Sequence, residues 1–234
     1  MAKSEEEHRA GLTFGGNLRA AIFGVSDGLV SNTSLIMGVS GAFADARTVL
    51  ITGAAGVLAG ALSMAAGEYV SMRSQRELFE QQLAREKEAL EEHPREEVDA
   101  LARIYHRRGV PLEVACRISK ALSADERAAL ETHAREHLGL NPDDLGSPVG
   151  AGLSSFVSFG LGATVPLLPF IFGAAAHAFI LAVALAAIGL FAVGVASSWV
   201  TGQARGRGGL RLLIVGGGAG LVAYLIGKLL GVSV

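Results

Sequence analysis

A carboxylate within an apolar stretch is the first residue of this chain that could do chemistry. Asp27 lies in the segment FGVSDGLVSNTSLIMG, residues 23–38, whose other side chains are apolar, small or uncharged. Spacings of four and three residues place Asp27, Ser31 and Ser34 on one face of a helix. A charged side chain at the centre of a membrane costs about 2.5–3.5 kcal/mol on insertion scales, so we expect Asp27 to have a function there. A helix cap, or an ion pair with Arg19, is the structural alternative.

A second stripe of candidate ligands follows in the next apolar segment. Met64, Glu68 and Met72 are spaced by four residues and share a helix face. No Asp or Glu follows Gly146, so a carboxylate within the membrane must come from the first two apolar segments. Carboxylate, hydroxyl and thioether groups around one cavity suit a borderline divalent transition metal better than Mg²⁺ or Ca²⁺. Core packing for Met64 and solvation for Glu68 are the alternatives.

The charged middle of the chain offers a third set of possible ligands. His133 and His137 are four residues apart on one predicted helix face, a recognised metal-ligand spacing. Glu86 and His93 are two turns apart on an earlier helix and also share a face. The alternative is a solvated helical bundle in which acidic and basic side chains balance. Histidine ligands would make metal loading sensitive to pH near neutrality.

The distribution of charge shows which elements must position these residues. Of the 234 residues, 50% are hydrophobic and 18% are charged, against about 25% charged in ordinary soluble domains. Between Arg73 and Leu145 lie 12 of the 20 basic and 16 of the 22 acidic residues. The chain is therefore a polar insert between apolar segments.

The apolar segments are long enough to cross a membrane, which takes about 20 residues each. Uncharged or nearly uncharged runs cover about 18–43, 48–67, 145–204 and 212–227, and the third is long enough for two spans with a break near Pro166 and Pro169. A soluble protein would have to bury 60 consecutive uncharged residues. We predict an all-α polytopic membrane protein with five transmembrane helices and a cytoplasmic helical metal-binding insert between helices 2 and 3.

The predicted domains follow from these runs. Residues 1–17 form a cytoplasmic N-terminal tail, 18–72 transmembrane helices 1 and 2, 73–145 the insert, and 146–234 transmembrane helices 3 to 5. Arginines crowd the connection between spans four and five, so the positive-inside rule places the N-terminus and insert in the cytoplasm. The acidic start, MAKSEEEHRAG, is not a cleavable signal peptide. Cys116, the single cysteine, suits a reducing compartment.

Local signals divide the insert into helices. The second span continues as an amphipathic helix that ends at His93, and a new helix begins after Pro94 with acidic residues in its first turn. A short segment covers 111–122, and a capping box from Ser123 to Glu126 opens the last helix. Two GxxxG motifs, at residues 56–60 and 216–220, predict close helix packing within one chain or between two.

These segments, taken together, resemble the vacuolar iron transporter family. The motifs are GVSDGLVSNTSLIMGVSGA, then AGALSMAAGEYVSMRSQRELFEQQLAREKEALEEHP, then GLGATVPLLPF, in order and over nearly the whole chain from Asn17. The resemblance implies a five-span homodimer that exports cytoplasmic Fe²⁺, sometimes Mn²⁺, in exchange for protons. It implies that Asp27 and Met64 hold the ion in the membrane.

The resemblance also implies a metal-binding role for the insert. Glu86 and Glu97 keep acidic positions of the family, and His133 and His137 fall where the family often has Met and Glu. Two further acidic positions of the family fall on Ala20 and Gly56 here, which affects selectivity and coupling. The candidate metal ligands are therefore Asp27, Met64, Glu68, Glu86, Glu97, His133 and His137.

The predicted function is proton-coupled export of Fe²⁺ or Mn²⁺, with the ion as substrate, no permanently bound cofactor and no enzymatic activity. Its partners are metal ions, protons, membrane lipid and a second copy of the chain. A bacterial host would make the membrane the plasma membrane. The alternative function is a membrane-anchored metal-binding or sensing protein whose insert is the working part. A ferritin-like oxidase would need Glu-x-x-His pairs, which the insert lacks, and no nucleic-acid signature is present.

Overall fold

The computed structural model describes residues 2–42, 45–141, 145–173 and 177–232, and its regular elements there are all helical. Five of these helices are long and apolar enough to cross a membrane, in the segments Ala20–Ala42, Ala46–Glu92, Pro148–Ile171, Ala178–Val200 and Arg205–Gly231. The predicted fold class, an all-α membrane protein with five spans and a helical insert, is confirmed.

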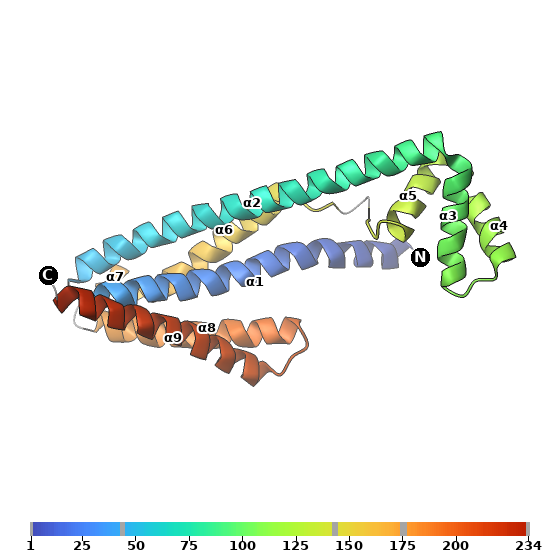
Figure 1. The fold of residues 1–234 in the computed structure, drawn as a ribbon. Coiled ribbons are helices and arrows are strands. Elements are labelled where there is room, and N and C mark those ends of the chain that lie inside the picture. Colours follow the sequence, from blue (N-terminus) through green and yellow to red (C-terminus); the bar gives the residue numbers. More distant parts are fainter. Residues whose placement is uncertain (1, 43–44, 142–144, 174–176, 233–234) are drawn as a thin grey trace. The chain divides into compact units, whose positions relative to one another are not determined.

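The chain forms two compact units (Figure 1). One contains Met1–Thr13 and Ser71–Ser147, and the other contains Phe14–Val70 and Pro148–Val234; we call them the insert unit and the membrane unit. Helices α1 (Ala2–Ala42) and α2 (Ala46–Glu92) each contribute to both. The second span therefore continues into the insert as one helix, as predicted from the amphipathic pattern that follows it.

The third span is interrupted where prolines remove backbone donors. Helix α6 (Pro148–Thr164) is followed by the 3₁₀ turn η1 (Val165–Leu167) and the short α7 (Leu168–Ile171). Helix α8 (Ala178–Val200) then begins the fourth span, and α9 (Arg205–Val232) forms the fifth. Figure 1 shows α8 and α9 lying side by side. The predicted break at Pro166 and Pro169 is present.

Small residues let the membrane helices approach closely. A Cβ atom added at Gly162 of α6 would overlap the carbonyl oxygen of Val25 in α1. The GxxxG glycines also pack within the chain: Gly60 lies against Phe159, and Gly220 lies against Met37. These two motifs therefore serve packing inside one chain, and they carry no argument for a dimer.

The insert unit adds three short helices to the end of α2. These are α3 (Pro94–Arg107), α4 (Leu112–Leu122) and α5 (Glu126–Glu136); α3 packs against both others. The expected capping box is wrong, because Ser123 ends α4 and Asp125 caps α5 by accepting a hydrogen bond from the Ala128 amide at 2.9 Å. Serine and aspartate are both favourable N-cap residues. Because Ser123 still belongs to the end of α4, Asp125 is the residue that caps α5.

The close approach of α1 and α6 predicts opposite outcomes for two neighbouring glycines. Gly162→Ala should destabilise the membrane unit by about 1–3 kcal/mol, because backbone must move to admit the methyl group. Gly160→Ala, with nothing within 4 Å of the added Cβ, should be neutral or slightly stabilising. Thermal unfolding in detergent measures both, and equal melting temperatures for the two variants would contradict the packing argument.

Candidate metal sites

Four side chains of the insert unit converge on one point. Glu86 comes from α2, Glu97 from the first turn of α3, and His133 and His137 from the last turn and C-cap of α5. One possible ligand atom from each lies within 4.8 Å of all the others. This separation matches donor atoms that surround one ion, each at about 2.0–2.2 Å from it.

Hydrogen bonds hold this cluster together. His133 Nδ1 lies at hydrogen-bond distance, 3.0 Å, from Glu86 Oε1, and it lies 3.5 Å from Glu97 Oε2, a contact that is not a hydrogen bond. His137 Nδ1 lies 3.3 Å from the same Glu86 oxygen. Glu86 is therefore the central residue, because it contacts both histidines of α5.

Burial distinguishes the members of the cluster. The side chains of His133 and Glu86 are 1% and 8% exposed, whereas that of His137 is 49% exposed. His133 Nε2 and Glu97 Oε2 are buried and, among the described residues, have no hydrogen-bond partner. A buried polar atom without a partner costs about 1–3 kcal/mol. A bound metal ion would remove this cost, because both atoms could act as its ligands.

Two nearby charged residues lie outside the cluster. His93 is exposed at the start of α3, so its shared face with Glu86 does not bring the two into one site. Glu136 forms an ion pair with Arg108. Burial, followed by the negative charge of Glu136, raises the pKa of the Tyr105 hydroxyl. Glu136 thus has partners of its own, Arg108 and Tyr105, outside the cluster.

A cavity in the membrane unit collects the second group of predicted ligands. It has a volume of about 310 Å³ and lies between α1, α2 and α6. Asp27 and Ser31 line it from α1, Met64 and Ser63 from α2, and Phe159 from α6. Among the described residues that line the cavity, Asp27 is the only titratable one, and its neighbours supply hydroxyl and thioether groups. The cavity therefore combines one carboxylate oxygen with soft sulfur.

Asn32 also lines this cavity, and the sequence analysis missed it. Its side chain is buried, and Nδ2 donates a 2.6 Å hydrogen bond to the carbonyl of Ala163, near the end of α6. Its Oδ1 is buried without a described partner and lies 2.9 Å from where a Cβ at Gly56 would stand. The absence of a side chain at Gly56 leaves room for this amide oxygen. The sequence did offer a signal for Asn32, because a polar carboxamide side chain is unusual within an apolar span.

Three other predicted positions do not join the cavity. Ser34 lines a separate, almost wholly apolar cavity between α1 and α9. Glu68, one turn beyond Met64 on α2, is half-buried and not part of the lining. Met72 belongs to the insert unit, and the Arg19 side chain lies outside the described residues. The predicted stripe of α2 therefore contributes only Met64.

Known proteins with similar sequences cover the same elements. A model of the VIT family matches residues 18–228. Vacuolar iron transporter 1 of Eucalyptus grandis is 30% identical over 225 residues, which cover 96% of this chain and 90% of the relative. Its namesake in Arabidopsis thaliana is 30% identical over 217 residues, covering 92% and 87%. The vacuolar iron transporter of Acanthamoeba castellanii is 37% identical over 163 residues, which cover 70% of this chain and 59% of the relative.

These matches confirm the resemblance first seen in the motifs. The family match begins in α1 before Asp27, includes the whole insert with its His and Glu cluster, and ends in α9. It thus contains the first four spans, most of the fifth, and both candidate metal sites. From its first span to its fifth, this chain belongs to the VIT family.

Proposed function

We propose that this protein exports Fe²⁺, with Mn²⁺ as a second substrate, from the cytoplasm in exchange for protons. The observation that carries the proposal is the cavity shared by Asp27 and Met64 within the membrane unit of a VIT-family chain. The names of the relatives, vacuolar iron transporters, support iron as the cargo. An enzyme is not proposed, since the family is one of transporters.

The donor set of the cavity suits such a cargo. A carboxylate oxygen and a thioether sulfur together favour borderline transition metals over hard Mg²⁺ or Ca²⁺. A carboxylate binds metal only when it is deprotonated, so protons and cations compete at Asp27, and this competition is the basis of antiport. An intramembrane carboxylate is costly, and attraction of a cation is what offsets that cost.

The insert cluster is proposed to collect the ion from the cytoplasm. Glu86 and Met64 lie on the same helix, about six turns apart, and Glu68 lies between them as a further proposed ligand. Glu97, His133 and His137 complete the collecting site. The N-terminus and the insert are proposed to lie in the cytoplasm. The support is the positive-inside rule, because Arg205, Arg207 and Arg211 lie at or near the connection between spans four and five.

A homodimer is proposed because of the exposure of the cavity. Asp27 and Ser31 are exposed in the single chain. A carboxylate facing lipid is strongly unfavourable, whereas a second copy placed against α1 and α2 would cover it. In a bacterial host, the membrane would be the plasma membrane and the role would be export.

A second candidate function has its own support. The insert cluster contains four convergent ligand atoms, and two of its members are buried, so it is a more complete site than the membrane cavity. A membrane-anchored metal sensor would need only this site. It predicts metal binding without any movement of ions.

Flux measurements separate the two functions. The full-length protein is reconstituted in liposomes that contain a dye quenched by Fe²⁺ and a pH indicator, with Mn²⁺ as the second ion. Fe²⁺ movement accompanied by opposing proton movement is the expected result, with protein-free liposomes as the control. Metal binding to the protein without flux of either ion would reject the transporter and leave the sensor.

A further inference from the structure

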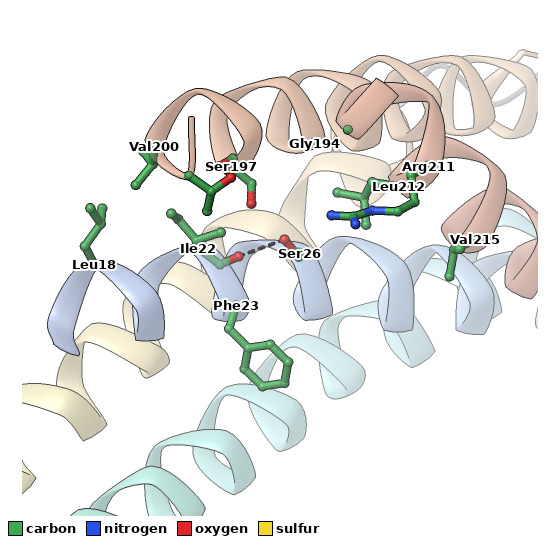
Figure 2. A pocket seen from close by; sticks show the side chains of 12 residues that line it. Leu18, Ile22, Phe23, Ser26, Gly194, Ser197, Val200, Arg211, Leu212 and Val215 are labelled. Carbon is green, nitrogen blue, oxygen red and sulfur yellow. Dashed lines mark hydrogen bonds between the residues drawn. The ribbon is translucent and has the colours of Figure 1, made fainter. Parts of the chain in front are cut away.

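A groove at one end of the membrane unit has a different chemistry from the metal sites. It has a volume of about 520 Å³ and lies between α1, α8 and α9, as Figure 2 shows. Its walls are mainly apolar, formed by Leu18, Ile22, Phe23, Val200, Leu212 and Val215. It has no carboxylate and no thioether, so it is not suited to a cation.

Two glycines let α8 and α9 approach closely beside this groove. Gly194 of α8 and Gly208 of α9 both line it, and a Cβ at Gly208 would lie 2.7 Å from the Gly194 carbonyl oxygen. The two helices therefore touch through their backbones at this end. This contact fixes the end of the groove where α8 and α9 meet.

One charged residue, Arg211, lies in the groove wall. Figure 2 shows its side chain extending from α9 into the groove, on the side of Ser26. Among the described residues Arg211 forms no ion pair, and the chain contains no acidic residue after Gly146. Arg211 is exposed at the edge of these apolar walls, and its planar guanidinium suits a phosphate group.

The surrounding residues place this end of the groove at the membrane surface. Trp199 is 68% exposed, and the guanidinium of Arg205 lies 5.7 Å from the centre of its ring. Arg207 follows in the first turn of α9. Tryptophan and arginine at the end of a span are typical of the headgroup region, and basic pockets between membrane helices bind acidic headgroups.

We propose that this groove binds one anionic phospholipid. Its phosphate contacts Arg211, and one acyl chain lies along the apolar wall from Val200 to Val215. Arg211, which forms no ion pair among the described residues, favours a headgroup with net negative charge over a zwitterionic one, because it repels the choline ammonium group of the latter. The mainly apolar walls favour a lipid over a free anion, because only a lipid would cover them with an acyl chain while its phosphate contacts Arg211.

The single tryptophan allows a direct test. The full-length protein is placed in mixed vesicles in which either phosphatidylglycerol or phosphatidylcholine carries bromine on its acyl chains, and quenching of Trp199 is measured. We expect phosphatidylglycerol to associate at this site about fivefold more strongly than phosphatidylcholine. Arg211→Gln should reduce this ratio to near one. Arg207→Gln, which removes an equal charge outside the groove lining, should leave it unchanged.

A second variant guards against misfolding of the first. Val215→Phe narrows the apolar part of the groove that would hold the acyl chain, and it keeps every charge. It should therefore weaken the quenching of Trp199 by both lipids. The proposal would be overturned if Arg211→Gln kept the wild-type preference for phosphatidylglycerol. It would also be overturned if Arg211→Gln and Arg207→Gln lowered this preference equally, because general surface charge would then explain it. Relief of quenching by inorganic phosphate would assign the site to a free anion. Loss of dimers in Arg211→Gln without a change in lipid preference would assign it to a second copy.

Discussion

Replacing Asp27 with alanine is expected to reduce Fe²⁺ flux to the level of protein-free liposomes, a loss of at least about 100-fold, or roughly 2.7 kcal/mol. Of the residues that the structure describes in the lining of the membrane cavity, Asp27 alone is titratable. Without it, Met64, Ser31 and Asn32 offer only neutral donors, and nothing offsets the dehydration of a divalent ion. The proton signal should disappear together with the metal signal.

Asp27→Asn separates charge from shape. It keeps the size of the side chain and removes the anionic ligand, so it should be as inactive as Asp27→Ala. Flux at the wild-type rate in this variant would show that the carboxylate is not the ligand. The measurement is the initial rate of dye quenching at several Fe²⁺ concentrations.

Asp45→Asn is the matched control. Asp45 precedes α2 and accepts hydrogen bonds from the Thr48 hydroxyl at 2.7 Å and the Thr48 amide at 2.9 Å. These bonds hold its pKa below the ordinary value, so it is charged at neutral pH like a free carboxylate. It is outside the cavity lining, and asparagine is also a good N-cap. Flux should be retained.

The second large effect is expected at the insert cluster. His137→Ala should weaken binding of Fe²⁺ or Mn²⁺ by the insert by at least about tenfold to 100-fold, the range found when groups that support a metal are lost. His137 is the better target because its side chain is half-exposed. His133→Ala would instead leave a cavity and deprive the buried Glu86 of its partner, so it tests folding as well as binding.

Calorimetric titration of the full-length protein measures this binding. Binding of metal should also raise the melting temperature, because an ion at 100 times its dissociation constant stabilises the folded state by about 2.7 kcal/mol. His106→Ala is the control: His106 is exposed in the last turn of α3, and its Nδ1 contacts the carbonyl of Val110. Equal weakening in the two variants would indicate non-specific binding, and no change in His137→Ala would remove this residue from the site.

Much of the architecture followed from the sequence alone. Apolar runs of span length, prolines at 166 and 169, and the concentration of charge between Arg73 and Leu145 predicted five spans and a helical insert. These features are local, because each helix in a membrane must satisfy its own backbone and cover it with apolar side chains. The spacing of His133 and His137 is also local, and it predicted a shared face.

Only the tertiary structure decided which faces meet. Helical spacing placed Ser34 beside Asp27 and Glu68 beside Met64, but rotation of α1 and α2 against α6 excludes Ser34 and Glu68 from the cavity and brings in Asn32. Glu86 and Glu97 come within reach of the histidines because the chain turns at His93. Such turns and rotations depend on packing between helices, where glycines permit backbone contact, and a one-dimensional pattern specifies a face without specifying its partner.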